Sequence, residues 1–288
     1  ISACLVGSEM CIRDRYIWTN TASYGFSIKD KHNFSMLLGQ EIYHSQNKKN
    51  FQKNRYFPRA FEAGQAWDNM GFGTPQESTS SLSTPDRTAS FFGQASYNYN
   101  HKYLLSVTMR ADGSTKFAPG NQWGYFPSVS GAWVLSEEKF MEDIKWIDQL
   151  KLRAAIGLAG NNRISDDMWR YLYTVNSTGG PGFGEATQFG EQWYGNQGGT
   201  TFANKNIKWE TTLTRNLAAD ITLFNGRLTV TPEIYWNTTK DLLYKSDIPS
   251  ATGYVSQMQN IGQVTNKGVE SVSYTHLRDH ETGRNLVC

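Results

Sequence analysis

The stretch YLLSVTMR, from Tyr103 to Arg110, alternates apolar and polar side chains along most of its length. Its odd-numbered positions are all apolar, and its even-numbered positions become polar after Leu104. In an extended strand, successive side chains point to opposite faces, so this stretch predicts a β-strand with one apolar and one hydrated face. We therefore expect an all-β fold.

The same two-residue period recurs along the chain, most clearly from Leu150 to Leu158 and from Leu228 to Trp236. It predicts nine strands, at residues 16–28, 33–44, 88–99, 103–112, 122–135, 149–159, 207–223, 227–243 and 259–270. Several of them reach the about 9–11 residues that a tilted strand needs to cross a bilayer. Strands of ordinary globular proteins average about half that length.

The connections between these strands alternate between short and long. Residues 29–32, residues 100–102 and the Asn225-Gly226 pair predict tight turns, the last with a strong type I′ hairpin signal. Residues 45–87 and 160–206 predict long loops. Residues 136–148 predict a short helix capped by Ser136. Long loops on one rim and short turns on the other are typical of outer-membrane barrels, with the loops extracellular and the turns periplasmic.

A soluble β-sandwich is the competing architecture, because its strands also carry one buried and one solvated face. Strand length and loop asymmetry favour the barrel. Pro232 in a predicted strand indicates a bulge or a local break, since proline loses a ladder hydrogen bond. Arg215 falls in the apolar register of its strand, so either it lies near a rim or the predicted register slips there.

The two ends of the chain are related to each other at the level of coding DNA. One permitted codon choice for SVSYTHLRDHE, residues 271–281, read as its reverse complement, encodes LVGSEMCIRDR, residues 5–15, except at Gly7. No folding requirement links a peptide to the antisense translation of another, and both stretches resemble translated transposon-adaptor sequence. We expect residues 1–15 and 271–288 to be adaptor-derived artefacts and residues 16–270 to be a partial barrel.

Composition excludes several classes of function. All three cysteines lie in those two ends, so residues 16–270 offer no thiolate metal site. The net charge of +2 and the absence of a long basic run give no electrostatic footprint for nucleic-acid binding. Eighteen consecutive apolar residues occur nowhere, which excludes helical membrane spans. We expect no metal site, because His32, His44 and His101 lack ligand-like spacing. We also expect no catalytic residues and no cofactor, since no acid/base or nucleophile arrangement is found in the sequence.

The longest motif is RADGSTKFAPGNQWGYFPSVSGAWVLSEEKFM, residues 110–141. It is followed in order by LKLRAAIGLAGNN from Leu150, IKWETTLTRNLAADITLFNGRL from Ile207, KDLLYKSDIPSATGY from Lys240 and NIGQVTNKGVE from Asn260. Together these segments closely resemble SusC/RagA-type TonB-dependent outer-membrane receptors over nearly all of residues 16–270.

This resemblance implies a transmembrane barrel of about 22 strands with an N-terminal plug, in the outer membrane of a Gram-negative bacterium. The chain then supplies about nine of those strands, and we expect it neither to insert nor to transport alone. The implied function is active import of oligosaccharides or peptides, energised by TonB through an absent N-terminal region. The implied partners are a SusD-like surface lipoprotein, the cargo and outer-membrane lipid. A siderophore or vitamin receptor and a soluble glycan-binding sandwich remain alternatives.

Two groups of residues are candidates for the site. Aromatic rings in the long loops can stack on sugar rings, and loop polar groups can bind their hydroxyls. The substrate candidates are Trp67, Trp169, Tyr173, Trp193 and Tyr194. Charged residues on polar strand faces point into the lumen and toward a plug, because a cation at the lipid midplane costs about 2–4 kcal/mol. These are Arg110, Lys151 and Arg153. The tryptophans expected in aromatic girdles or facing lipid are Trp18, Trp123, Trp133, Trp209 and Trp236.

Overall fold

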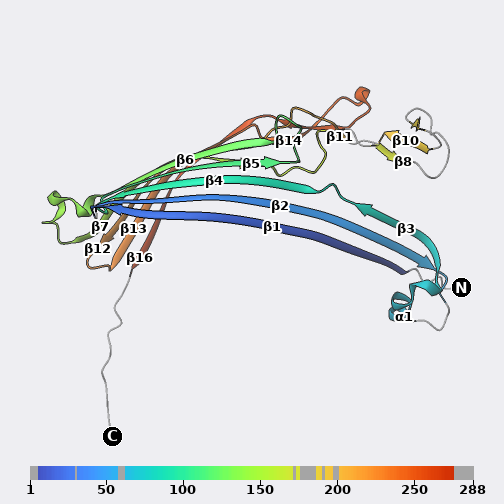
Figure 1. The fold of residues 1–288 in the computed structure, drawn as a ribbon, viewed down its shortest axis with the longest axis horizontal. Coiled ribbons are helices and arrows are strands. Elements are labelled where there is room, and N and C mark those ends of the chain that lie inside the picture. The colour runs from blue at the N-terminus through green and yellow to red at the C-terminus, as the bar shows by residue number, and fades with distance from the viewer. Residues whose placement is uncertain are drawn as a thin grey trace, which may run out of the picture.

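A computed structural model describes residues 6–29, 31–57, 62–170, 173–175, 186–189, 192–196 and 201–275. One sheet of ten strands dominates it (Figure 1), and every neighbouring pair in this sheet is antiparallel. Nine of its strands follow one another in chain order, β1-β2-β4-β5-β6-β7-β12-β13-β16. Among the described residues, no helix is long and apolar enough to cross a membrane.

The nine predicted strands are confirmed, with shifted ends. They are β1 (Val6–Ile28), β2 (His32–Arg55), β4 (Asp86–Tyr99), β5 (Tyr103–Ser114), β6 (Trp123–Val134), β7 (Ile147–Asn161), β12 (Glu210–Leu223), β13 (Leu228–Lys240) and β16 (Gln263–Thr275). The shortest have 12 residues, enough for a tilted strand to cross a bilayer. Residues 6–15 and 271–275 belong to β1 and β16. This pairing does not test their adaptor origin, which stays a prediction.

The tenth strand, β3 (Thr74–Leu82), is missing from the prediction. It pairs with the far half of β2, next to the short helix α1 (Ala63–Asp68) and the 3₁₀ turn η1 (Met70–Phe72). Every residue of β3 is exposed, so its sequence carries no alternating apolar signal. The predicted loop at residues 45–87 is therefore partly an extension of β2, with β1 paired along one side of it and β3 along the other.

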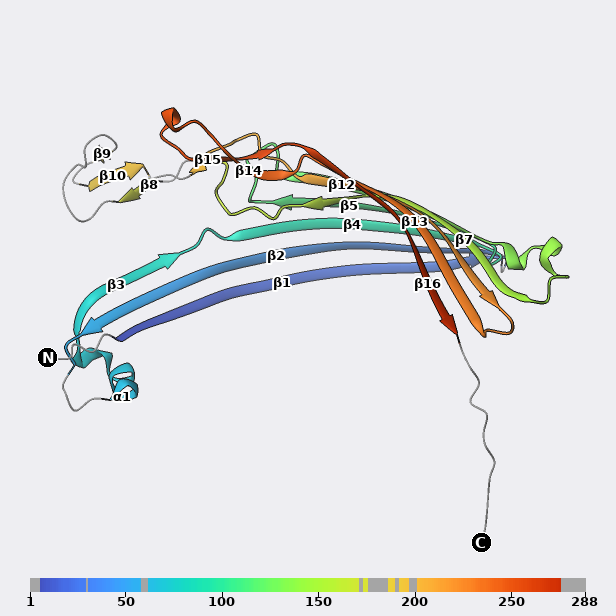
Figure 2. The same ribbon diagram turned by 180° about the vertical axis from the view of Figure 1, so that it is seen from behind.

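The short strands that do not belong to the large sheet gather at one of its ends, which we call the loop rim (Figures 1 and 2). One small sheet there joins β11 (Thr201–Phe202), β15 (Ser256–Asn260) and β14 (Leu243–Asp247). The 3₁₀ turn η4 (Ser250–Thr252) connects β14 to β15. Another joins β8 (Tyr173–Val175), β10 (Gln192–Asn196) and β9 (Ala186–Phe189). The opposite end, the turn rim, carries the short connections.

Backbone conformation explains the turn between β12 and β13. Phe224, Asn225 and Gly226 all have positive φ, between 58° and 76°. Asparagine tolerates this left-handed region and glycine adopts it at no steric cost, so the predicted hairpin forms here. Residues 224–227 lie outside both strands, which makes the connection longer than a two-residue loop.

The helix predicted for residues 136–148 is wrong. Two separate 3₁₀ turns, η2 (Leu135–Glu137) and η3 (Lys139–Met141), occupy its first half. Glu138 between them accepts hydrogen bonds from the Tyr103 hydroxyl at 2.7 Å and the Trp133 indole at 3.3 Å, and pairs with Lys102 at 3.3 Å. These three donors lie on or beside the strand ends, and their bonds hold the chain in tight turns.

The apolar rows of the strands are exposed. Tyr103, Leu105, Val107 and Met109 on β5 each keep 44–47% of their surface accessible, while the side chains between them are half-buried. No second layer of described residues covers this outward face, so the sandwich alternative is wrong. Positions that pair across the sheet share a face, and the apolar rows therefore continue from strand to strand.

Aromatic residues form two belts on the outward face. Near the turn rim, Phe34 lies 4.8 Å from Tyr97 and Tyr103 lies 6.2 Å from Trp133, between ring centroids. Toward the loop rim, Trp123 stacks on Phe91 at 6.1 Å. Trp123 is paired with Gly113, so the belts are separated by the run from Tyr103 to Gly113. That run spans about 33 Å along a strand, or about 25 Å of bilayer at a tilt of about 40°.

The structure accounts for two irregular positions that the sequence predicted on β12 and β13. The pairing of these strands is interrupted opposite Thr231 and Pro232 and resumes in the same register, so the break predicted at Pro232 exists without a bulge. Arg215 pairs with Ile156 and Trp236 in unbroken register. It therefore lies on the outward, apolar face, and a slip of register is excluded as the explanation.

Candidate functional site

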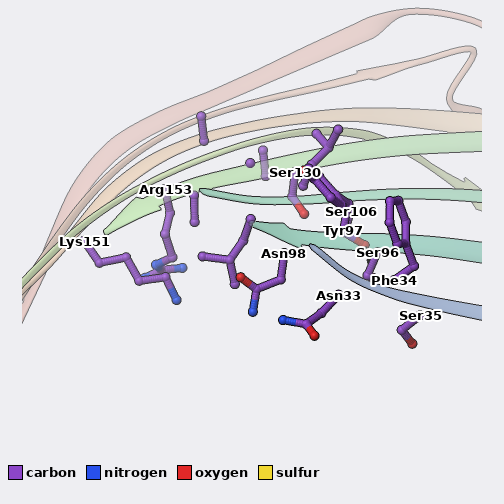
Figure 3. A pocket seen from close by; sticks show the side chains of 16 residues that line it. Asn33, Phe34, Ser35, Ser96, Tyr97, Asn98, Ser106, Ser130, Lys151 and Arg153 are labelled. Carbon is purple, nitrogen blue, oxygen red and sulfur yellow. Dashed lines mark hydrogen bonds between the residues drawn. The ribbon is translucent and has the colours of Figure 1, made fainter. Parts of the chain in front are cut away.

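The inward face of the curved sheet is polar and hollowed. A hollow of about 530 Å³ is lined by residues of β2, β4, β5, β6 and β7, among them Asn33, Asn98, Lys151 and Arg153. Figure 3 shows these side chains projecting from the same side of the sheet, beneath the arching strands. Serine hydroxyls form the floor, where Ser96 and Ser106 lie 3.1 Å apart. The hollow offers donors, acceptors and two cations to whatever fills it.

The charges predicted to face the lumen lie on this face, and two of the three are paired. Arg153 donates two hydrogen bonds of 2.9 Å to Asp220 on the next strand. Arg110 donates to both oxygens of Asp112 at 2.8 Å. Lys151 has no side-chain partner within the described part of the chain. The positive charge left over in the hollow is therefore that of Lys151.

The Arg153–Asp220 pair was missed at the level of sequence. Asp220 and Glu233 both fall in the polar rows of their strands, but their partners depend on the strand register. In the structure Asp220 lies opposite Lys151 and next to Arg153, and Glu233 accepts a 2.6 Å hydrogen bond from Asn216. Periodicity assigns a residue to a face; it does not say which neighbour it meets.

A second hollow, of about 640 Å³, lies along β12, β13 and the edge strand β16, and its lining is mostly inward residues with Thr265 and Lys267 of the outward row at its border. Glu233 and Glu270 face each other across β13 and β16 in its lining, with Tyr235 and several asparagines around them. Like charges placed opposite on neighbouring strands repel each other. The inward face thus has an acidic region at β13 and β16 and a basic one at β7.

A small hydrophobic core closes the inward side of the loop rim. Its buried members are Phe117, Phe126, Ile164, Ile207 and Trp209. The ring of Phe126 meets that of Trp209 edge-on at 5.5 Å, and the Trp209 indole donates a 2.9 Å hydrogen bond to the Gln122 carbonyl. The expectation that Trp209 faces lipid or a girdle is wrong, because it is 8% exposed in this core.

Two glycines make this core possible. A Cβ on Gly160 would lie 2.0 Å from the Phe126 ring, and one on Gly124 would lie 2.4 Å from it. Strands β6 and β7 therefore leave room for one large ring on their inward face. The core fixes the loop segments at residues 115–122, 162–168 and 203–209 against the sheet, which gives the loop rim a rigid base.

Polar contacts join the loops above this core. Asp167 forms a 2.6 Å ion pair with Arg170 and accepts a hydrogen bond from the Thr84 hydroxyl. Burial raises the pKa of the neighbouring Asp166, an effect opposed by Lys116. The buried indole nitrogen of Trp169 has no hydrogen-bond partner among the described residues. The Trp169 N–H is therefore a donor that the described residues leave unsatisfied.

The structure does not bring the five substrate candidates together. Trp67 is an exposed residue of α1, which lies well apart from β8 and β10 in both views (Figures 1 and 2). Trp169 is half-buried in the turn that follows β7. Tyr173 belongs to β8, and Trp193 and Tyr194 belong to β10. The side chains of these last three lie outside the described residues, so their role stays a prediction.

Comparison with known proteins places this geometry in a family. Residues 8–282 match the family model described as TonB dependent receptor-like, beta-barrel. The chain is 35% identical to the TonB-dependent receptor SusC of Bacteroides thetaiotaomicron over 82% of its own length and 22% of that protein. It is 35% identical to the TonB-dependent receptor P26 of Formosa agariphila over 90% of its length and 25% of that protein.

Solved structures agree with the fold. The chain is similar to the RagAB peptide transporter, with a TM-score of 0.80 at 24% sequence identity, over 95% of this chain and 29% of that one. A likeness at this identity concerns the fold alone. The chain spans about a quarter of the length of the curated relatives it matches.

Proposed function

Since the chain belongs to the TonB-dependent receptor β-barrel family, we propose that it forms part of an outer-membrane active importer of oligosaccharides or peptides. The family consists of outer-membrane transport proteins of Gram-negative bacteria and not of enzymes. In this proposal TonB supplies the energy, and a SusD-like lipoprotein covers the loop rim. The name of the relative, TonB-dependent receptor SusC, supports the role of TonB.

One observation carries the proposal. The outward rows of the sheet are mainly apolar and exposed, with aromatic belts separated by about 25 Å, the height of the apolar band of such barrels. A bilayer can bury this face, because its hydrocarbon covers the apolar rows and the aromatic rings lie at the two membrane–water interfaces. The polar inward face then lines a passage.

The inward face supports passage of a polar cargo and contact with a plug. Lys151 and the serine hydroxyls of the first hollow can bind acceptor groups, and Glu233 and Glu270 of the second can bind donors. Sugar hydroxyls and peptide groups both present donors and acceptors. Arg110 and Arg153 are already paired, so we propose that they orient the face toward a plug and that Lys151 contacts it.

Uptake by the full-length receptor that carries this chain tests the proposal. Membranes from cells expressing the receptor are fractionated, and uptake of labelled oligosaccharides and of labelled peptides is compared in strains with and without TonB. We expect the receptor in the outer-membrane fraction, TonB-dependent uptake of one cargo class and co-purification of a surface lipoprotein. Recovery in a soluble fraction, or uptake of neither class, would contradict the proposal.

A further inference from the structure

Two cations interrupt the outward apolar face in one row of paired residues. The row crosses six strands and consists of Val107, Val129, Ile156, Arg215, Trp236 and Lys267. Its first three members are exposed apolar side chains. Arg215 and Lys267 are its only charged members, and they lie on either side of Trp236.

The height of these residues follows from the ends of their strands. Val107 lies four residues after Tyr103, at the turn end of β5. Arg215 lies eight residues before Leu223, and Trp236 lies eight residues after Leu228, at the same rim. Eight residues rise about 20 Å in a strand tilted by about 40°. Arg215 and Trp236 therefore lie near the loop-side limit of the about 25 Å band, where interface tryptophans are typical.

Neither cation finds a partner among the residues that the structure describes. Within the described part of the chain, the side chains of Arg215 and Lys267 form no hydrogen bond or ion pair, and both are exposed. The surrounding outward positions of β7, β12, β13 and β16, between residues 150–158, 211–221, 230–240 and 263–271, contain no aspartate or glutamate. Lys267 stands on the edge strand and also borders the second hollow.

An anion from the membrane fits this arrangement. A guanidinium presents five donors in a planar fork that binds phosphate in two places, and an ammonium adds three more donors. A phosphate lies at the headgroup level of a lipid, while the acyl chains below it cover Ile156 and the neighbouring apolar row. The indole of Trp236 then spans the boundary between the two layers.

We propose that Arg215 and Lys267 bind the phosphate groups of a lipid in the loop-side leaflet, with Trp236 packed against that lipid. This inference rests on the membrane orientation in the proposed function. The ligand class is a phosphorylated lipid headgroup. Arg215 provides the paired donors and Lys267 a second positive charge.

The full-length receptor that carries this chain tests the lipid site by native mass spectrometry in detergent. The probes are bis-phosphorylated lipid A and its dephosphorylated form, each added at increasing concentration, with inorganic phosphate as a competitor. We expect Arg215→Gln to weaken binding of the phosphorylated lipid about tenfold, the loss of about one charge-assisted bond. We expect Lys267→Gln to weaken it about threefold, and Arg215→Lys to weaken it by a similar factor because lysine keeps the charge and loses the planar fork.

Arg227→Gln is the matched control, because Arg227 lies on the same hairpin at the opposite rim. It should leave the affinity unchanged. Equal affinity of wild type and Arg215→Gln, equal binding of the dephosphorylated lipid, or complete displacement by inorganic phosphate would each overturn the site. Heat-modifiable migration of every variant reports insertion separately, so a failure of the membrane orientation is distinguishable from a failure of lipid binding. If Arg215→Gln fails to insert, Lys267→Gln and Arg215→Lys decide.

Discussion

On the outward face of β5 and β6, Val107 and Val129 stand opposite each other with more than two fifths of each residue exposed. On the inward face of the same strands, Arg110 binds Asp112 and the hydroxyl of Ser90. The inward side chains find partners within the protein, whereas the outward ones have only their neighbours in the row. The outward side chains therefore require an apolar environment outside the protein. The inward side chains are satisfied by hydrogen bonds and ion pairs within it.

The largest expected effect comes from placing a charge on each face in turn. Val107→Arg puts a cation near the middle of the apolar band, and we expect it to reduce the free energy of unfolding by about 2–4 kcal/mol. Thr108→Arg puts the same cation on the inward face, where water or a plug can solvate it. We expect that change to cost under about 1 kcal/mol. Denaturant unfolding of the full-length receptor in lipid vesicles measures both changes in unfolding free energy. Equal losses for the two variants would contradict the proposed difference between the faces.

Crowding of the Phe126 ring has the next largest effect. Gly160→Ala brings a methyl group into that ring, and we expect a loss of about 1–3 kcal/mol in unfolding free energy, as for other overpacked cores. Gly131→Ala is the control, because its Cβ would meet nothing nearer than the Leu104 carbonyl at 3.8 Å. In a Phe126→Leu background the cost of Gly160→Ala should shrink. An unchanged cost would mean that the ring is not the obstacle.

The ion pairs of the inward face should matter less. Arg153 is about two fifths exposed, so its bidentate pair with Asp220 is largely screened by solvent. We expect Asp220→Asn to lower the unfolding free energy by at most about 1 kcal/mol. Asp143→Asn in the exposed turn after β6 is the control, with no expected change. A loss of about 3 kcal/mol would show that the inward face is drier than its exposure indicates.

The smallest effect concerns pH at the turn rim. The Tyr103 hydroxyl, with Trp133 and Lys102, holds the pKa of Glu138 below its ordinary value. A lowered pKa in the folded state stabilises the fold above the ordinary carboxyl range, and this contribution is lost as the pH falls through the lowered pKa. Melting temperatures of wild type and Tyr103→Phe, recorded from neutral to acidic pH, should converge at low pH. A constant difference would contradict this role of Glu138.

Local periodicity was sufficient to predict the nine strands and the face of residues well inside them. Val107 and Arg110 could be assigned to opposite faces because alternation needs only the neighbouring residues. The strand β3 could not be predicted, since all of its side chains are exposed and no period distinguishes them from a loop. The same local rule placed Trp209 on the wrong side of the protein, because its burial depends on Phe117 and Phe126, far away in the sequence.

The inward face was predicted as a set of charges and not as a set of contacts. The pairing of Arg153 with Asp220 requires the register of β7 and β12, and a shift by one residue would move both side chains to the other face. The substrate candidates have a similar limit: Trp67 and Trp169 could be assigned to two long loops, but the sequence does not give the conformation of those loops or the distance between them.

The central claim is that the outward rows face hydrocarbon. Each residue from Leu104 to Met109 is replaced by cysteine in turn in the full-length receptor, labelled with a nitroxide and placed in lipid vesicles. Accessibility to oxygen, which concentrates in hydrocarbon, is compared with accessibility to a water-soluble nickel chelate. The account predicts high oxygen accessibility at 105, 107 and 109 and low oxygen accessibility at 104, 106 and 108. Equal accessibility at all six positions, or shielding of the odd positions from both reagents, would contradict it.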